Sequence, residues 1–354
     1  MKQSEKNYKR IVIKIGSSLF YSHKHLLDYS TLNAVASETA QLVKSGKEIV
    51  IVSSGAIALG MHVLGLKERP KELYNLQAAA AIGQNEVINQ YRSFFRGKGI
   101  HAAQVLLTWE DFDDRRRYLN AKNTLLALLK YGSAPIVNEN DTVSTDEIKF
   151  GDNDKLSALV ASLISADLLV ILSDVDGLLD RNKNVIRIVD AVTEQIKSLA
   201  SPTDKQISVG GMITKIEAAK IATDSGIPCV IANGRRKDII LSVIKEPEEY
   251  GTLFLSKKCL AARERWIAFG TKSKGKIMVD EGAMNALMNK KSLLSVGVIA
   301  TEGIFECGDI VSVIDRQNRE FARGKVGVSY KQLSKVKGSH FDKEVIHRDN
   351  IVIL

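Results

Sequence analysis

The sequence predicts an α/β fold, with a mainly parallel β-sheet sandwiched between helices and a small β-rich C-terminal domain after it. Short apolar runs rich in β-branched residues recur along the first two thirds of the chain, and longer helix-compatible segments separate them. This alternation is typical of βαβ units, and continuous apolar runs are typical of strands buried on both faces. From about residue 272 the pattern changes to short strands separated by glycine turns. The change predicts a second, β-rich unit.

Each expected element follows from one of these patterns. The apolar runs predict strands that begin at Ile11, Glu48, Ile100, Ala134, Asp167 and Ile227. The segments between them predict helices over residues 31–45, 76–95, 119–131, 155–164 and 212–225. The C-terminal strands are expected within KGKIMVDEG, SLLSVGVIA, GDIVSVID and EFARGKVGVS. A mixed α+β domain is the less favoured alternative for the first part of the chain.

The length and the change of pattern also predict the domain organisation. A chain of 354 residues is long enough for two domains, each with its own core. We expect the first domain at residues 1–256, a linker at 257–271 and the β-rich domain at 272–354.

The charge is unevenly distributed between these domains. The chain has 50 Lys plus Arg and 41 Asp plus Glu, a net charge of +9. Residues 257–354 hold 18 basic and 11 acidic residues, or +7, which leaves 32 minus 30, or +2, for residues 1–256. Such an excess favours contact with polyanions, although scattered surface lysines that serve solubility are the commoner explanation.

The cysteines and the apolar segments indicate the compartment. Cys229, Cys259 and Cys307 are odd in number and too widely spaced for a zinc cluster, which fits reduced thiols better than disulfides. The apolar run at residues 11–15 is too short for a signal-peptide core, and no stretch approaches eighteen apolar residues. We therefore expect a cytoplasmic protein that neither crosses nor enters a membrane.

Polar residues gather where four of the expected strands end. They form the groups Gly16-Ser17-Ser18, Ser53-Ser54-Gly55, Asn138 to Asp141, and Ser173-Asp174. In open parallel sheets the carboxyl ends of the strands form the ligand-binding edge. The four groups therefore predict one cleft.

Two glycine-plus-lysine elements predict phosphate binding. Lys14 and Gly16 end the first strand, and GGMITK at Gly210 leads through two glycines into a helix that carries Lys215. Backbone amides, a helix N-terminus and a lysine are donors that bind phosphate. Neither GxGxxG after a strand nor GxxxxGK[ST] occurs, so a dehydrogenase and a P-loop NTPase are both disfavoured. An ordinary turn and an ordinary helix start are the alternatives for each element alone.

A dense polar tract follows the fourth strand. Residues 138–141 read NEND, and GDND follows at residues 151–154. Amide and carboxylate groups of this kind bind a substrate ammonium group, coordinate Mg²⁺ through oxygen, or orient lysines. Capping of the next helix by Asp152 or Asn153 explains only one of these residues.

No general base stands out near the tract. His62 and His101 lie far apart without a GxSxG elbow, which disfavours a hydrolase triad. The charged run DFDDRRR at residues 111–117 is expected to be a solvated helix face or an ion-pair network rather than a catalytic site. If the phosphoryl acceptor is a carboxylate, with a pKa of roughly 4, it is ionised at neutral pH and needs no base. Positioning and charge neutralisation would then suffice.

On these motifs the chain resembles the glutamate 5-kinase family, in which an amino acid kinase domain precedes a PUA domain. The resemblance rests on IVIKIGSSL at Ile11, IVSSGAIALG at Ile51, AAIGQ at Ala80, LNAKNTLLALL at Leu119, IVNENDTVSTDEIKFGDNDKLSALVA at Ile136, LSDVDGLL at Leu172, GGMITK at Gly210 and GTLF at Gly251. GKIMVDEGAMNAL, KSLLSVGV, FECGDIVSVID and ARGKVGVS look like a PUA module. The resemblance implies ATP-dependent phosphorylation of the γ-carboxylate of L-glutamate to L-glutamyl 5-phosphate, the first step of proline biosynthesis.

The resemblance also implies roles for individual residues. Lys14 and Lys215 would contact the ATP phosphates and stabilise the transferring group, and Asp154 would hold the two lysines in place. Glutamate would be bound by Ser54, Asp141 and Asn153. The nucleotide would be bound by Lys14, Gly16, Ser173, Asp174, Val209, Gly210, Gly211, Met212, Ile213, Thr214 and Lys215. Mg²⁺ would arrive with ATP, ligated mostly by phosphate oxygens and water, so no separate metal site is expected.

Partners follow from the same resemblance. It implies feedback inhibition by proline, a homo-oligomer (dimer or tetramer) and functional coupling to glutamate-5-semialdehyde dehydrogenase. The apolar helix over residues 76–88 is one candidate interface, and an ordinary core helix is the equal alternative. Because the chain ends at HRDNIVIL, without the longer tail of some relatives, RNA binding by the PUA-like domain is not the favoured role. Two alternatives stay open: another amino acid kinase acting on aspartate, N-acetylglutamate, carbamate or a nucleotide, and an RNA-binding protein whose kinase fold is a relic.

Overall fold

The computed structural model describes residues 8–21, 27–144, 153–200, 211–256 and 261–354. Contacts between Cα atoms divide the chain into two compact units. The first unit comprises Met1–Asp111 and Tyr118–Cys259, and the second comprises Phe112–Arg117 and Leu260–Leu354. Each unit has its own hydrophobic core.

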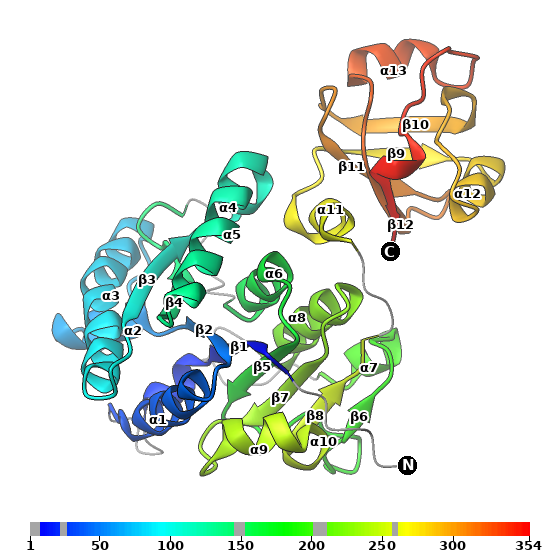
Figure 1. Ribbon diagram of the computed structural model, residues 1–354. Helices are drawn as coiled ribbons and strands as arrows, with labels where there is room; N and C mark the ends of the chain where they lie inside the picture. The colour runs from blue at the N-terminus through cyan, green and yellow to red at the C-terminus, as the bar shows by residue number, and fades with distance from the viewer. Residues whose placement is uncertain (1–7, 22–26, 145–152, 201–210, 257–260) are drawn as a thin grey trace. The chain divides into compact units, whose positions relative to one another are not determined.

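The first unit is built on an eight-stranded sheet (Figure 1). Its strands are β1 (Arg10–Ile15), β2 (Glu48–Ser53), β3 (Ala102–Leu107), β4 (Ala134–Glu139), β5 (Leu168–Ser173), β6 (Ile188–Val189), β7 (Cys229–Asn233) and β8 (Gly251–Phe254). They lie in the order β3-β4-β2-β1-β5-β7-β8-β6, and within this sheet only the β7–β8 pair is antiparallel. The predicted mainly parallel sheet is confirmed. The six strands expected from apolar runs are all present, whereas the short strands β6 and β8 were not predicted.

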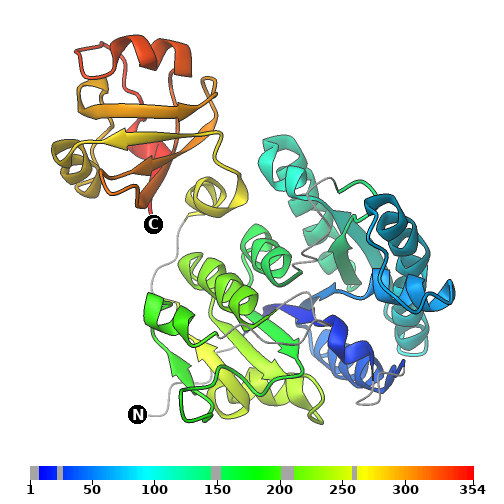
Figure 2. The same cartoon turned by 180° about the vertical axis from the view of Figure 1, so that it is seen from behind.

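Helices cover both faces of this sheet. They are α1 (Ser30–Lys44), α2 (Ala56–Val63), α3 (Leu73–Arg96), α4 (Trp109–Asp113), α5 (Arg115–Lys130), α6 (Asn153–Ile164), α7 (Glu194–Ser198), α8 (Met212–Asp224), α9 (Ile239–Lys245) and α10 (Pro247–Tyr250), with a 3₁₀ turn η1 (Ser17–Phe20). Helices α6 and α8 lie side by side on one face, and α1 contacts α3 and α9 on the other (Figures 1 and 2). The predicted sandwich of helix, sheet and helix is therefore correct.

Burial on both faces explains why the sequences of the central strands are continuous apolar runs. All six residues of β5 are buried, and five of the six in β1. In the register, Ile13 of β1 is paired with Ile51 of β2 on one side and with Val170 of β5 on the other. Burying each such side chain contributes roughly 1.5–3 kcal/mol, so the sheet interior fixes the positions of the strand ends.

Helices α2 and α3 pack closely because glycines line their contact. A Cβ atom on Gly60 would lie 1.8 Å from the Ala79 carbonyl oxygen, and one on Gly83 would lie 1.8 Å from the Ala56 carbonyl oxygen. Helix α2 begins directly after Gly55, whose φ of 101° is left-handed and favours glycine. The close contact holds the chain that leaves β2 against α3.

The second unit is the predicted β-rich domain. Its strands are β9 (Gly275–Val279), β10 (Val298–Gly303), β11 (Ile310–Ile314), β12 (Glu320–Lys325) and β13 (Ile351–Ile353), in the order β10-β9-β11-β12-β13. Its helical segments are α11 (Ala262–Arg265), η3 (Trp266–Gly270), α12 (Glu281–Met288), η4 (Ser295–Gly297), α13 (Tyr330–Val336) and η5 (Arg348–Asn350). Side-chain caps from Asp280 and Ser329 start α12 and α13, as expected for these residue types.

The segment Phe112–Arg117 packs within this second unit. The Trp266 indole donates to the Phe112 carbonyl oxygen over 3.0 Å, and the Arg115 guanidinium lies 5.4 Å from the centre of the Trp266 ring. The backbone amide of Lys272 donates to the Asp113 carboxylate over 2.6 Å. Asp114 to Arg117 are exposed, as expected for a solvated helix face, whereas Phe112 is buried.

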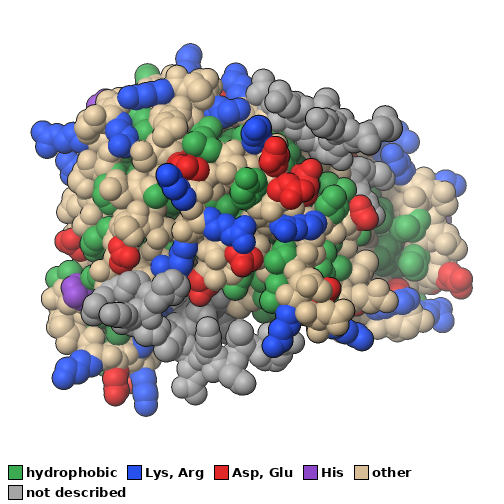
Figure 3. All heavy atoms as spheres, turned by 90° about the horizontal axis from the view of Figure 1, so that it is seen from below, with side chains coloured by type: hydrophobic (Ala, Val, Ile, Leu, Met, Phe, Trp, Pro, Cys, Tyr) green, Lys and Arg blue, Asp and Glu red, His purple; other side chains and the backbone are tan. Residues whose placement is uncertain are grey.

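The charges on the surface and the lengths of the helices test the expectations for polyanion and membrane partners. On the face shown in Figure 3, basic and acidic side chains lie among one another rather than in one continuous basic area. None of the described helices is long and apolar enough to span a membrane.

Candidate active site

Four neighbouring strands bring their carboxyl ends to one edge of the first sheet. β4, β2, β1 and β5 are adjacent and mutually parallel. The residues that follow them belong to the four polar groups from which the sequence predicted a cleft. The loop after β1 is tied to the end of β5, because the Gly16 amide donates to the Leu172 carbonyl oxygen over 3.0 Å.

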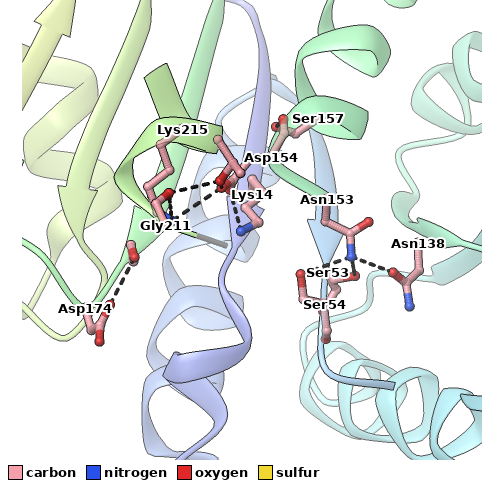
Figure 4. A network of polar contacts seen from close by, with 12 residues as sticks. Lys14, Ser53, Ser54, Asn138, Asn153, Asp154, Ser157, Asp174, Gly211 and Lys215 are labelled. Carbon is pink, nitrogen blue, oxygen red and sulfur yellow. Dashed lines mark hydrogen bonds and ion pairs between the residues drawn. The ribbon is translucent and has the colours of Figure 1, made fainter. Parts of the chain in front are cut away.

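Two lysines from different elements contact one carboxylate (Figure 4). Lys14 Nζ of β1 lies 2.5 Å from Asp154 Oδ1, and Lys215 Nζ of α8 lies 3.3 Å from Asp154 Oδ2. The hydroxyl of Thr214 donates to Asp154 Oδ2 over 2.8 Å. We call Lys14, Asp154, Thr214 and Lys215 the lysine clamp. The lysines that were predicted to contact phosphate thus lie together, with Asp154 between them.

The lysine clamp is buried, and burial shapes its electrostatics. Lys14, Asp154 and Lys215 are only 6%, 1% and 5% exposed. Burial alone would raise the pKa of the Asp154 carboxyl, but the charges of both lysines and the hydrogen bonds from Lys14 and Thr214 lower it to about 2. Burial lowers the pKa of Lys215, and the Asp154 charge opposes that shift. Two ammonium groups around one carboxylate leave one net positive charge, which attracts an anion.

Helix α8 presents its first turn beside this charge. Gly211 precedes the helix in an extended conformation, without a side-chain cap, and Lys215 Nζ lies 3.4 Å from the Gly211 carbonyl oxygen. Uncapped amides at a helix N-terminus favour a phosphate. Met212 is half-buried and Ile213 is exposed in this turn. Val209 and Gly210, also expected at the nucleotide, lie outside the described residues, as does Asp152.

The end of β5 supplies the other expected nucleotide residues. Ser173 is buried, and its hydroxyl donates to the exposed Asp174 carboxylate over 3.2 Å. Both follow the strand next to β1, so they lie at the same edge of the sheet as Lys14 and Gly16.

A second group of polar side chains surrounds the end of β2. The Asn153 amide nitrogen donates to Ser54 Oγ over 3.0 Å, to Asn138 Oδ1 over 2.9 Å and to the Ser53 carbonyl oxygen over 3.3 Å. The Asn138 amide nitrogen donates to Gln84 Oε1 of α3 over 2.7 Å. We call Ser54, Gln84, Asn138 and Asn153 the amide cluster. The structure thus brings together two of the three residues predicted to bind glutamate, Ser54 and Asn153.

Asp141, the third of these residues, lies two positions after β4. Within the described part of the chain, no hydrogen bond joins it to Ser54 or Asn153. Burial raises the pKa of the Asp141 carboxyl to about 6, and the nearby charge of Arg69 opposes that shift. A carboxylate at this place carries negative charge at neutral pH, which suits a substrate ammonium group.

Sequence reasoning missed several residues at this edge. Asn138 belongs to the NEND tract, which was expected at the cleft, but it received no role of its own, and Gln84 of the AAIGQ motif received none. A third is Arg235 in the loop after β7, whose Nη2 donates to the carbonyl oxygens of Ser18 and Tyr21 over 2.8 and 2.7 Å. The signal that could have identified Arg235 is the pair Arg235-Arg236 shortly after the buried strand β7. Polar groups at the ends of the other strands were used in the same way to predict the cleft.

Side chains alone offer little for a metal ion here. Among the described residues no group of three or more His, Cys, Asp or Glu is arranged to hold one. The polar groups at this edge are mainly lysines and amides. They suit an anion that brings its own cation better than a cation held directly by protein side chains.

Comparisons with known proteins identify the family of the chain. The amino acid kinase family matches residues 9–233, and the PUA domain matches residues 275–347. The chain is 45% identical to the glutamate 5-kinase of Thermoanaerobacter sp. (strain X514) and 46% identical to that of Caldanaerobacter subterraneus subsp. tengcongensis, covering 98% of this chain and 98% of each relative. It is 42% identical to the glutamate 5-kinase of Syntrophotalea carbinolica over 98% of this chain and 97% of the relative.

A solved structure adds evidence on the fold alone. N-acetylglutamate synthase from Neisseria gonorrhoeae, complexed with coenzyme A and N-acetyl-glutamate, matches with a TM-score of 0.53 and 16% identity. The match covers 71% of this chain and 60% of that one. With the family matches and the close relatives over nearly the whole length, the chain belongs to the glutamate 5-kinases of the amino acid kinase family.

Proposed function

We propose that this chain transfers the γ-phosphoryl group of ATP to the γ-carboxylate of L-glutamate, giving L-glutamyl 5-phosphate and ADP, the first step of proline biosynthesis. The relatives named glutamate 5-kinase, similar over 98% of the chain, support the reaction. One observation carries the assignment to this site: Asn153 and Asp154 are consecutive in α6, yet Asn153 belongs to the amide cluster and Asp154 to the lysine clamp. An acceptor site and a phosphoryl site thus meet at one helix turn.

The lysine clamp is the phosphoryl side of the proposed site. Lys14, Lys215 and the amides at the start of α8 bind the ATP phosphates, Gly16 lies beside them, and Ser173 and Asp174 border the nucleotide. Phosphoryl transfer spreads negative charge over the oxygens of the moving group, and fixed cations stabilise that charge. Asp154 keeps the two ammonium groups a fixed distance apart, so they need not reorganise during the reaction.

The amide cluster is the acceptor side. Ser54, Asn153 and Asp141 bind glutamate and direct its γ-carboxylate toward the nucleotide. An oxygen of that carboxylate forms a bond to the γ-phosphorus while the bond from this phosphorus to the bridging oxygen of ADP breaks, and the leaving oxygen keeps the electron pair. No base is needed, because the attacking carboxylate is ionised at neutral pH. Mg²⁺ bound with ATP through phosphate oxygens and water supplies further charge neutralisation.

Further properties belong to the same proposal. Proline inhibits the enzyme by occupying the glutamate site or its surroundings, and the labile acyl phosphate passes to glutamate-5-semialdehyde dehydrogenase in the cytoplasm. The enzyme is a dimer or tetramer. Several apolar side chains of residues 76–88 are buried within the chain itself, so the exposed Val63, Leu64, Leu66, Leu73 and Tyr74 nearby are better candidates for the interface.

Hydroxylamine trapping of the acyl phosphate tests the reaction. The protein is incubated with ATP, Mg²⁺ and L-glutamate, L-aspartate, N-acetyl-L-glutamate or carbamate, and hydroxamate and ADP are followed together. We expect hydroxamate and an equal amount of ADP with glutamate alone. Product from another carboxylate would overturn the assignment of Ser54, Asp141 and Asn153 to glutamate while keeping the phosphate roles.

A further inference from the structure

The amide cluster contains a chain of three side-chain amides that runs from α3 to α6. Gln84 Oε1 accepts from the Asn138 amide nitrogen over 2.7 Å, and Asn138 Oδ1 accepts from the Asn153 amide nitrogen over 2.9 Å. All three side chains are buried, with exposures of 8%, 1% and 5%. The chain therefore links α3 to Asn153, which is expected to bind glutamate.

Backbone groups fix the orientation of two amides in this chain, and the orientation of the third follows from them. The backbone N–H of Glu139 donates to Asn138 Oδ1 over 2.9 Å, and a backbone N–H contacts only an acceptor. The Ser53 carbonyl oxygen accepts from the Asn153 amide nitrogen over 3.3 Å, and a carbonyl contacts only a donor. With Asn138 and Asn153 oriented in this way, the Gln84 atom that faces Asn138 is its oxygen.

This orientation determines what Asn153 offers to a ligand. Its nitrogen is used by Ser54 and Asn138, and its oxygen is turned away from both (Figure 4). Asn153 Oδ1 is buried and has no hydrogen-bond partner among the described residues. A buried acceptor without a partner is costly, by roughly 1–3 kcal/mol, and a substrate that donates a hydrogen bond removes that cost. An ammonium group meets this requirement, whereas a carboxylate does not.

We propose that Gln84 is a positioning residue that holds Asn138, and through it Asn153, so that Asn153 Oδ1 accepts from the α-ammonium group of the amino acid substrate. The proposal rests on the proposed function. Gln84 itself touches no substrate in this scheme. Without its oxygen, the Asn138 nitrogen is left buried and unpaired, and Asn138 relieves this by turning away from Asn153. The Asn153 amide then rotates, and the acceptor for the ammonium group is lost.

Two variants of Gln84 and one control test this role. Gln84→Met keeps the size of the side chain and removes its oxygen. Gln84→Glu keeps an oxygen toward Asn138 and replaces only the amide nitrogen, which has no partner among the described residues. Asn85→Met is the matched control, because Asn85 is the next residue of α3 and is exposed. Steady-state kinetics are measured with L-glutamate, with glutarate, which lacks the ammonium group, and with ATP, and folding is followed by thermal unfolding.

Gln84→Met is expected to raise KM for glutamate about tenfold or more and to leave KM for ATP within about twofold. Its preference for glutamate over glutarate in kcat/KM should fall by the same factor, a change that a merely loosened structure does not produce. Gln84→Glu and Asn85→Met should keep KM for glutamate within about threefold of the wild type. An unchanged preference for glutamate in folded Gln84→Met overturns the proposal, and so does a large rise in KM for glutamate in folded Gln84→Glu.

The same experiment separates this role from the proposed function. A wild-type enzyme that forms no hydroxamate with glutamate contradicts the function itself. A normal wild type with an unaffected Gln84→Met contradicts only the role of Gln84. If Gln84→Met does not fold, the same comparison of glutamate with glutarate is made with Gln84→Leu, which also lacks the oxygen.

Discussion

Lys14 and Lys215 contact different oxygens of one carboxylate, Lys14 at 2.5 Å on Oδ1 and Lys215 at 3.3 Å on Oδ2 of Asp154. The two lysines come from β1 and α8 and are 201 positions apart along the chain, but they meet at the same sheet edge. The carboxylate therefore holds two like charges close together in a buried setting, where they would otherwise repel each other. This arrangement leads directly to the first two predictions.

Replacing Lys215 with alanine should reduce kcat about 10²–10³-fold, the range seen when one preorganised donor to a transition-state charge is removed. Lys220→Ala is the control, because Lys220 lies on the same helix and pairs only at the surface, with Asp224. Turnover is measured by hydroxamate formation, and circular dichroism checks folding. A folded Lys215→Ala enzyme with normal turnover contradicts the role of this lysine.

Asp154→Asn should change how stability depends on pH. The pKa of Asp154 is lowered to about 2 in the folded protein, against roughly 3.9 in an unfolded chain. A carboxyl group whose pKa is lower in the folded protein stabilises the fold at every pH above its pKa in the unfolded chain. That contribution, roughly 2–3 kcal/mol, is lost as pH falls from about 4 to about 2. Urea unfolding at pH 5 and pH 3 should show a steeper loss for the wild type than for Asp154→Asn. Equal losses would rule out the coupling.

Glutamate binding should weaken in mild acid because of Asp141. Its pKa is raised to about 6, chiefly by burial, so the carboxylate that we propose to face the ammonium group is protonated as pH falls through that value. KM for glutamate should rise below pH 6 in the wild type and stay high and flat in Asp141→Asn. Arg69→Met removes the charge that lowers this pKa and should move the transition to higher pH. If the pH at which KM rises is the same in the wild type and in both variants, Asp141 is not the group that titrates.

Gly83→Ala should destabilise the first unit strongly. The added Cβ would lie 1.8 Å from the Ala56 carbonyl oxygen and 2.4 Å from the Gly60 backbone nitrogen, so α2 and α3 must separate, at a cost of about 1–3 kcal/mol or more. Gly97→Ala at the end of the same helix meets nothing within 4 Å and should be neutral. Denaturant midpoints of the two variants compare the effects. Equal midpoints would mean that the helix contact is more compliant than the geometry indicates.

The sequence predicted the parts of this fold that depend on simple patterns. The continuous apolar runs of β1, β2 and β5 predicted strands buried on both faces, and the polar residues after them predicted the site at the carboxyl edge. The short strand β8 was missed because four residues carry too weak a pattern. Helix α2 was missed because it depends on the left-handed Gly55 and on close contact with α3, which only the folded chain shows.

The candidate site was predictable in its residue types but not in its connections. Lys14 and Lys215 were identified from glycine-plus-lysine motifs, and the resemblance supplied Asp154 as their partner. Gln84 could not be identified, because α3 carries many polar residues and the sequence does not show which of them has a buried hydrogen-bond partner. Its link to Asn138 depends on the tertiary packing of α3 against the end of β4.

Because Asn153 and Asp154 are neighbours on one rigid helix turn, the spacing between the acceptor side and the phosphoryl side is set by the backbone of α6. A shorter or longer dicarboxylic acid therefore cannot be accommodated by shifting α6, since the residue that holds the lysines would shift with it. The choice of chain length falls instead to groups that can move independently of that helix, such as Asp141 after β4. Redesign for a different acceptor should begin at that loop and leave the first turn of α6 unchanged.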